Sequence, residues 1–145
     1  MCSSDLAALG HRAALPAMAE GGRIVNISSL AAVAATPLTA YKISKAGMNA
    51  LGQSLALANA RHGIRVNTIM PGLIDTPMAI EGIAAEQGLP PEEVRARRDR
   101  VVPLRGRMGT AWDVAHAALY LHSDEAVFVT GVVLPVDGGQ SARVG

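Results

Sequence analysis

The sequence has few of the residues that several large classes of protein require. It contains one cysteine, Cys2, in 145 residues, which excludes an internal disulfide. It contains one Trp, two Tyr and one Phe, and its formal net charge is only +1. Binding to nucleic acid depends mainly on phosphate neutralisation and base stacking. We therefore do not expect nucleic acid as a partner.

Long hydrophobic runs and metal-binding patterns are also missing. No stretch reaches the roughly 18 uninterrupted apolar residues that a membrane span needs, and the first residues lack the pattern of a secretory signal. The four histidines have no metal-binding spacing and no cysteine partner. We expect a cytoplasmic protein without membrane contact or metal. Half of the residues are hydrophobic and 17% are charged, which is typical of a folded domain.

The order of apolar runs and breakers predicts an α/β fold with a small parallel sheet. Residues 5 to 20 predict the end of a helix, stopped by Gly21 and Gly22. Strands are predicted at 23–27, 64–70 and 132–136, with a helix at 40–61 between the first two. A strand, a crossover helix and a strand imply a parallel pair. Because Pro135 cannot donate to a ladder, the last strand should lie at an edge.

Start signals predict three further helices, and the long helix has an unusual surface. Thr76-Pro77 and Pro91-Glu92-Glu93 each begin a short helix between residues 77 and 101. Thr110 and Asp113 have the spacing of a capping box at the start of another. The helix at 40–61 is apolar on most faces. We expect it to pack on the sheet and also on another helix, from this chain or from a second subunit.

Polar residues follow each strand, where parallel sheets bind their ligands. Tyr41 and Lys45 are four residues apart and therefore share one face of a helix. That helix follows the strand that ends in Ser28 and Ser29. A hydroxyl, a phenol and an ammonium group should thus meet at one strand end.

These motifs, in this order, resemble the short-chain dehydrogenase/reductase family. The resemblance runs from about residue 13 to residue 140 and implies the C-terminal part of a Rossmann-type doubly wound parallel sheet, with about three strands retained. Neither G-x-G-x-x-G nor T-G-x-x-x-G-x-G is present, so the N-terminal dinucleotide-binding half is missing, and the family's helix asparagine has no match. We expect residues 1–145 to form a single partial domain. The matching motifs are Asn26-Ile27-Ser28-Ser29, Tyr41 with Lys45, Pro71-Gly72-Leu73-Ile74-Asp75-Thr76, Thr130-Gly131 and Asp137-Gly138-Gly139.

The resemblance implies an NAD(P)-dependent oxidoreductase that interconverts a secondary alcohol and a ketone by hydride transfer. A proton must then move on or off the substrate oxygen. A free phenol, with a pKa of about 10, is a poor base near neutral pH, but a neighbouring ammonium group favours the phenolate and lowers that pKa. The family pattern makes Tyr41 the general acid/base and Lys45 this ammonium group, which also binds the nicotinamide ribose. A serine orients the substrate oxygen.

Two serines compete for that last role. Counting along the strand favours Ser29, whereas counting back from Tyr41 leads to Ser28, because the loop is one residue short after Pro37. Since strand register changes less readily than loop length, we prefer Ser29.

The resemblance also assigns the cofactor segment and the lid. Pro71, Gly72, Ile74 and Thr76 should hold the nicotinamide carboxamide of NAD or NADP, together with Tyr41 and Lys45. Residues 77–103 correspond to the substrate-binding lid, and a β-ketoacyl thioester, a steroid, a sugar or a small cyclic alcohol would suit it. The arginines of this region favour a solvated face, with Glu93 and Arg97 at a helpful spacing, and an anionic substrate or carrier is the alternative. They are Arg95, Arg97, Arg98, Arg100, Arg105 and Arg107.

The remaining expectations concern assembly and the first residues. We expect a homodimer or homotetramer through the helix at 40–61 and the C-terminal strand. Residues 1–12, including Cys2, depart from the family pattern, and we interpret them as a candidate artefact of assembly or cloning. The alternative to an enzyme is a non-catalytic fragment, or an oligomerisation module that uses the apolar helix.

Overall fold

The computed structural model describes residues 3–18 and 20–143. Its core is one parallel sheet of three strands, β1 (Arg23–Ile27), β2 (Arg65–Pro71) and β3 (Val133–Val136). The strands lie in the order β1-β2-β3, so β2 is central and β3 is an edge. The predicted parallel pairing and the edge position of the strand that contains Pro135 are both confirmed.

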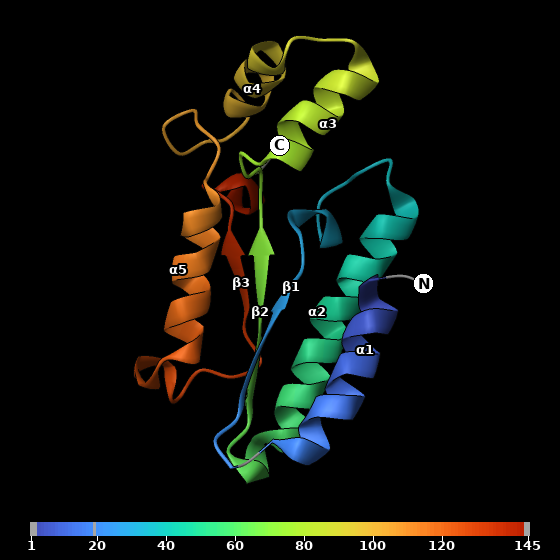
Figure 1. The fold of residues 1–145 in the computed structure, drawn as a ribbon. Coiled ribbons are helices and arrows are strands. Elements are labelled where there is room, and N and C mark those ends of the chain that lie inside the picture. The colour runs from blue at the N-terminus through green and yellow to red at the C-terminus, as the bar shows by residue number, and fades with distance from the viewer. Residues whose placement is uncertain (1–2, 19, 144–145) are drawn as a thin grey trace.

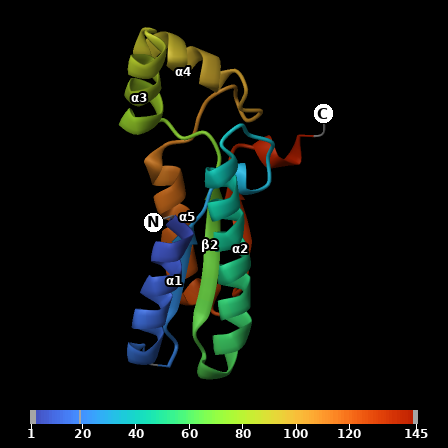
Figure 2. The same cartoon turned by 90° about the vertical axis from the view of Figure 1, so that its right-hand side faces the viewer.

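Helices cover both faces of this sheet and one of its ends (Figures 1 and 2). On one face lie α1 (Ser3–Ala14) and α2 (Thr39–Asn59), and on the other lies α5 (Ala111–His122). Beyond the carboxyl ends of the strands stand α3 (Pro77–Gln87) and α4 (Pro91–Asp99). Short 3-10 helices occupy η1 (Leu15–Ala17), η2 (Leu30–Ala32), η3 (Ala60–His62), η4 (Asp124–Ala126) and η5 (Gln140–Ala142). No helix within the described residues is long and apolar enough to cross a membrane.

The helix ends follow local signals, with one correction. The α3 start has its predicted cap, since the Thr76 hydroxyl accepts a hydrogen bond from the Ala79 amide, and the α5 start has its predicted capping box. The first helix ends at Ala14, earlier than Gly21 suggests. The reason is Pro16, which has no N–H and disfavours the helical conformation in the residue before it. Cys2 lies outside the described residues.

The long helix α2 packs by a single stripe of small or flexible residues. Its buried residues recur every fourth position: Ser44, Met48, Gly52 and Ala56. A Cβ atom at Gly52 would lie 2.6 Å from the Thr68 hydroxyl, so glycine is what allows the helix to approach the sheet this closely. The second helix that we expected beside α2 is α1 of the same chain. The opposite side of α2 stays exposed, including Ile43 and Leu57.

The hydrophobic core is divided between the sheet and the lid. One cluster lies under α2, around Ala56, Ile64 and Val66. The other lies within the lid, where Ile80 and Val94 from the two lid helices meet residues of the next segment. The lid therefore has a core of its own beyond the sheet. The first strand has less cover, because among the described residues β1 pairs only with β2 and Ile27 is 45% exposed, as we expected for an open edge.

Candidate active site

Tyr41 and Lys45 lie on the first turns of α2 and face the end of β1. The Lys45 Nζ atom lies 5.7 Å from the centre of the Tyr41 ring. The same Nζ donates a hydrogen bond of 3.0 Å to the carbonyl of Ile27, the last residue of β1. This bond holds the ammonium group between the strand end and the phenol. Within the described part of the chain the Tyr41 hydroxyl has no hydrogen-bond partner, and the residue is 43% exposed.

The two serines after β1 have different environments. Ser28 is buried, and its hydroxyl donates to the Lys45 carbonyl at 3.0 Å. Ser29 is half-buried, and its hydroxyl accepts a hydrogen bond of 3.2 Å from the Ala31 amide, so its proton is available to another acceptor. The accessible hydroxyl of the pair is therefore that of Ser29.

Lys42 holds the loop between Ser29 and Tyr41, a role that sequence reasoning missed. Its Nζ donates to the carbonyl of Ala34 at 2.6 Å and to that of Val33 at 3.3 Å. Adjacent residues of a helix do not share a face, so Lys42 points away from Tyr41 toward this loop. No motif in the sequence signals this contact.

The segment after β2 is fixed from the end of β3. The amide of Gly72 donates to the Val136 carbonyl at 3.0 Å, and the amide of Leu73 donates to the Gln140 side chain at 2.8 Å. A Cβ atom at Gly72 would lie 2.4 Å from the Gln140 side-chain oxygen and 2.8 Å from the Asp137 Cα atom, so only glycine fits here. Sequence reasoning missed Gln140, whose only signal is its place directly after Asp137-Gly138-Gly139.

Asp137 organises the turn that carries Gln140. Burial opposes its ionisation, but hydrogen bonds from Ser141, Gly139 and Gln140 outweigh burial and hold the pKa of Asp137 below its ordinary value. The amides of Gly139 and Ser141 donate to its two oxygens at 2.8 and 2.7 Å. The ionised carboxylate thus stabilises the turn from which Gln140 reaches Leu73.

The rest of the segment is tied to the lid and to α5. The Gly109 amide donates to Leu73 O, and the Asp75 amide donates to Gly109 O, so residues 73–75 have a fixed backbone. The guanidinium group of Arg95, on α4, donates to Asp75 at 2.8 Å from Nε. The Thr76 hydroxyl accepts from the Ala79 amide at 3.3 Å and keeps its own proton.

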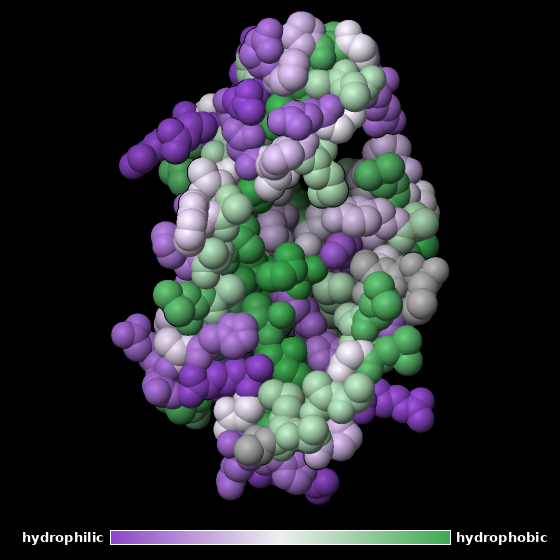
Figure 3. Space-filling model, in the orientation of Figure 1, coloured by the Kyte–Doolittle hydropathy of each residue, from purple (hydrophilic) through white to green (hydrophobic). Residues whose placement is uncertain are grey.

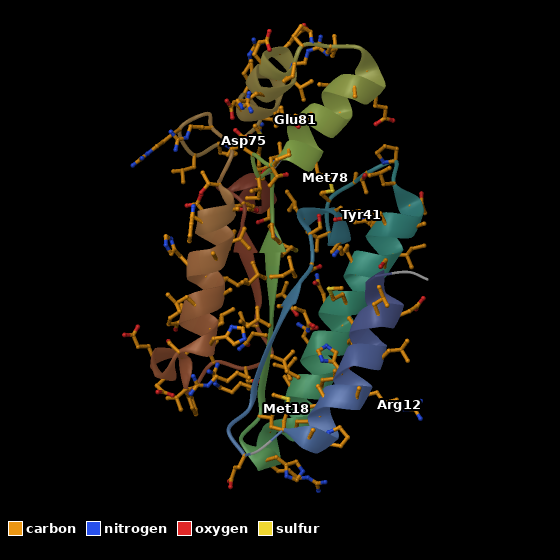
Figure 4. All side chains as sticks on the ribbon, in the orientation of Figure 1. Arg12, Met18, Tyr41, Asp75, Met78 and Glu81 are labelled. Carbon is orange, nitrogen blue, oxygen red and sulfur yellow. The ribbon has the colours of Figure 1, made fainter. Side chains whose placement is uncertain are left out.

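These residues follow the carboxyl ends of β1 and β2 and therefore lie toward the same end of the sheet. The surface is hollowed between α3 and the N-terminal end of α2 (Figure 3). Tyr41 lies on the α2 side of this hollow, beside η2, and Met78 lies at the start of α3 (Figure 4). Lys45 keeps two N–H donors after its bond to Ile27. Together with the hydroxyl protons of Ser29 and Thr76, these donors suit a ribose, a carboxamide and a substrate oxygen.

Comparison with known proteins identifies the family. The family model described as enoyl-(acyl carrier protein) reductase matches residues 3–141. The chain belongs to the short-chain dehydrogenase/reductase family. The match begins before residue 13, where the motifs begin, and it includes α1. It covers the C-terminal portion of this family, and the sheet is the corresponding part of the Rossmann-type fold.

Two curated relatives show how much of the family the chain spans. It is 38% identical over 139 residues to the 2,5-dichloro-2,5-cyclohexadiene-1,4-diol dehydrogenase LinX of Sphingobium indicum, covering 94% of this chain and 52% of the relative. It is 45% identical over 125 residues to 3beta-hydroxysteroid dehydrogenase 1 of Eggerthella lenta, covering 86% of this chain and 45% of the relative. The chain spans about half the length of the curated relatives it matches.

Solved structures agree with this assignment. A putative short-chain dehydrogenase/reductase from Burkholderia xenovorans superposes with a TM-score of 0.87 at 40% identity, over 96% of this chain and 54% of that one. The aldohexose dehydrogenase of Thermoplasma acidophilum superposes with a TM-score of 0.85 at 35% identity, over 92% and 54%.

Proposed function

We propose that this chain carries the catalytic half of an NAD(P)-dependent oxidoreductase that interconverts a secondary alcohol and a ketone. The observation that supports this most is the placement of Lys45, whose ammonium group lies between the Ile27 carbonyl and the ring of Tyr41. A phenol with a fixed cation beside it and no protein partner for its hydroxyl suits proton exchange with a bound substrate. The relatives with printed activities are dehydrogenases, which supports the same reaction.

Each proposed catalytic residue has one task. Tyr41 takes the proton from the carbinol oxygen during oxidation, or gives it to the ketone oxygen during reduction. Lys45 stabilises the phenolate electrostatically. Ser29 donates a hydrogen bond to the substrate oxygen, which orients the carbon for reaction. The nicotinamide ring of NAD or NADP, when bound, supplies or accepts the hydride.

The proposed cofactor contacts come from two segments. Lys45 would use its remaining N–H donors on the nicotinamide ribose, with the Tyr41 hydroxyl nearby. Pro71, Gly72, Ile74 and Thr76 would line the carboxamide, and the fixed backbone of this segment supports that role. No glycine-rich turn for a pyrophosphate is present in the sequence, so the chain alone should bind either dinucleotide very weakly.

The proposed substrate is a cyclic secondary alcohol with an apolar ring. The lid over residues 77–103 presents Met78, which is 85% exposed, beside the hollow that holds Tyr41. The names of several relatives describe dehydrogenases of ring alcohols, namely a cyclohexadiene diol, a hydroxysteroid and a hydroxycyclohexanecarboxylate. Such rings would pack on apolar lid residues with the carbinol directed toward Tyr41.

A second proposal concerns assembly. The outer side of α2 exposes Ile43 and Leu57 at 67% and 83%, and the outer edge of β3 is unpaired. We propose that these two surfaces form a homodimer or homotetramer. Analytical ultracentrifugation of the chain, compared with an Ile43→Glu and Leu57→Glu double variant, tests this proposal. A monomer before substitution would contradict it.

A chimera tests the proposed reaction. Residues 3–141 would replace the matching half of the Burkholderia xenovorans protein, whose fold superposes on 96% of this chain. We expect NAD(P)-dependent oxidation of cyclic secondary alcohols by the folded chimera and negligible turnover by the chain alone. A folded chimera that binds dinucleotide and turns over no alcohol in a broad panel would contradict the proposal, as would saturable micromolar binding of NADH or NADPH to the chain alone.

The same chimera distinguishes the two serines. Ser29→Ala should lower kcat by about 100-fold with little effect on folding, because it removes one donor to the reacting oxygen. Ser28→Ala should mainly lower stability, because its hydroxyl is buried on the Lys45 carbonyl. The reverse pattern would assign the role to Ser28.

A further inference from the structure

The arginines of the lid region divide into two groups. Arg95 is paired with Asp75, and Arg97 is paired with Glu93 at 2.5 Å, as its spacing predicts. Arg98 is half-buried, and burial lowers its pKa while the nearby Asp75 opposes that shift. Arg95 and Arg97 are therefore paired with carboxylates of their own region, whereas the buried Nε of Arg98 has no hydrogen-bond partner within the described part of the chain.

The second group lies on the segment between α4 and α5, which we call the arginine loop (residues 100–107). Among the described residues, no carboxylate is bonded to Arg100, Arg105 or Arg107, and all three are exposed. Asp113 interacts electrostatically with Arg107, but its carboxylate accepts its hydrogen bonds from the amide and hydroxyl of Thr110. Hydrophilic side chains are prominent around this loop (Figure 3), beside the exposed apolar Val101 and Leu104. The loop thus presents three guanidinium groups to which no carboxylate of the described residues is hydrogen-bonded.

The backbone of the arginine loop is held in an unusual shape. Arg105 has φ 59°, the only positive value among the described non-glycine residues, and Gly106 follows with φ 57°. Such left-handed residues are costly outside glycine and gather at ligand clamps and switches. Hydrogen bonds pin both sides of the turn, from the Leu104 amide to Gly138 O and from the Met108 amide to Asp99. The fold therefore holds the Arg105 side chain at a cavity despite the strain.

That cavity has apolar walls and charged groups of both signs in its lining. Its volume is about 630 Å³, within the range of small-molecule sites. Its apolar walls come from Leu73, Ile74, Leu104, Met108 and Val136. Arg105 and Arg107 also line it, as do Asp113 and Asp137, whose carboxylates already accept hydrogen bonds from Thr110 and from the Gly139 and Ser141 amides. A second cavity on the other side of the loop is lined by Arg100 and Arg143 and shares Gly139 with the first. None of Ser29, Tyr41 and Lys45 lines either cavity.

We propose that the first cavity binds a phosphate monoester of an apolar group. Guanidinium groups pair with phosphate oxygens through two parallel N–H bonds, and Arg105 and Arg107 offer unpaired guanidinium groups at the cavity. The apolar walls accommodate the esterified group. The second cavity adds Arg100 and Arg143 to the same positive surface. The cavity shares Ile74 with the proposed carboxamide site but none of the proposed catalytic residues, so binding here leaves Ser29, Tyr41 and Lys45 unoccupied.

Titration of the whole chain followed by amide NMR tests the proposal at constant ionic strength. The probes are phenyl phosphate, inorganic phosphate and phenol. We expect saturable binding of phenyl phosphate, at least tenfold tighter than either other probe, with shifts at Gly106, Gly109, Gly138 and Gly139. Equal affinity for inorganic phosphate or for phenol would overturn the proposal, as would the absence of saturation.

Matched variants separate a specific site from general charge attraction. Arg105→Asn combined with Arg107→Gln should weaken phenyl phosphate binding at least tenfold. Asparagine tolerates the left-handed backbone, so this variant should stay folded. Arg12→Gln removes an exposed arginine on α1 and should leave the affinity unchanged. Equal losses in the two variants would show general attraction and would overturn the assignment.

Discussion

β1 and β2 lie side by side in register, yet the chain surrounds them to different extents. β2 has a neighbour on each edge, and its residues 65–70 are all buried. β1 has one neighbour, and only Asn26 is buried along it. The difference extends to the polar side chains of each strand. Comparing residues of the same type on the two strands therefore shows how much burial of a strand contributes to stability.

The first pair is Arg65 and its register partner Arg23. The buried Arg65 guanidinium donates to the carbonyls of Leu121, Ser123 and Val129, which fastens the start of β2 to the end of α5. The partly exposed Arg23 donates to the carbonyl of His122 and pairs with Asp124. Both arginines donate hydrogen bonds to the turn that follows α5, but only the Arg65 side chain is buried.

The second pair is Asn67 and Asn26. The Asn67 amide is satisfied at both ends, donating to Val129 O at 2.9 Å and accepting from the Val132 amide at 3.1 Å. Asn26 Oδ1 accepts one hydrogen bond from His11 Nε2 at 2.9 Å, and its Nδ2 has no partner within the described part of the chain. Residues of this chain thus satisfy both ends of the Asn67 side chain on β2. The β1 end, which carries Ser28 and Ser29, is organised on fewer sides.

The largest expected difference is between the two arginines. Arg65→Met should lower the free energy of unfolding by about 3 kcal/mol, because it leaves buried carbonyls without donors. Arg23→Met should cost less than about 1 kcal/mol, because its ion pair is exposed. Urea denaturation followed by circular dichroism measures both. Equal losses of unfolding free energy in the two variants would contradict the expected difference between β2 and β1.

Gly52 tests the contact that both strands share with α2. Gly52→Ala should destabilise the chain by about 2 kcal/mol, since the new Cβ would lie 2.6 Å from the Thr68 hydroxyl and 3.2 Å from the Asn26 side chain. Gly47→Ala, in the same helix with nothing near its Cβ, should stabilise it by about 0.5 to 1 kcal/mol. Thermal unfolding of both variants gives the comparison. Two stabilised variants would show that α2 does not approach the sheet as described.

The two asparagines should differ by a smaller amount. Asn67→Leu loses two satisfied hydrogen bonds, whereas Asn26→Leu loses one and also removes an unpaired donor, so their costs should differ by about 1.5 kcal/mol. Chemical denaturation at a single pH measures the difference. A larger cost for Asn26→Leu would mean that β1 is the better satisfied strand.

The smallest expected effect is a pH dependence at the β2 end. The pKa of Asp137 is lower in the folded chain than in the unfolded one, because Ser141, Gly139 and Gln140 bond its carboxylate despite its burial. Its contribution is therefore complete above about pH 4, the range of an unfolded aspartate, and is lost as pH falls through the lower folded value. The unfolding free energy of Asp137→Asn should show a weaker acid dependence than that of the parent. If the unfolding free energies of the variant and the parent changed equally with pH, the Asp137 carboxylate would not stabilise this turn.

Local signals predicted the elements well, and distant contacts account for the rest. Thr76, Thr110 and Pro135 each act on the backbone of their own or nearby residues, so their effects on helix starts and strand position are readable from the local sequence. The contact of Gln140 with Leu73 joins residues far apart in the chain, and no local pattern encodes it.

The candidate site also combines features that local spacing predicts with contacts that depend on the fold. The four-residue spacing of Tyr41 and Lys45 predicted their shared helix face, which the structure confirms. Two contacts depend on how α2 packs against β1. They are the hydrogen bond from Lys45 to the Ile27 carbonyl and the hydrogen bond from Lys42 to the Ala34 carbonyl. Spacing alone therefore located the groups, and packing decides what each one touches.

The most direct test of the central claim compares the two tyrosines of the chain in the active chimera. Tyr41 and Tyr120 are both 43% exposed, but only Tyr41 has Lys45 beside its ring. Tyr41→Phe should lower kcat/KM by about 100-fold to 10,000-fold, the usual contribution of a general acid/base, with dinucleotide binding retained. Tyr120→Phe should leave kcat/KM unchanged. Retained turnover in Tyr41→Phe, with the chimera folded, would contradict the assignment of Tyr41 as the acid/base.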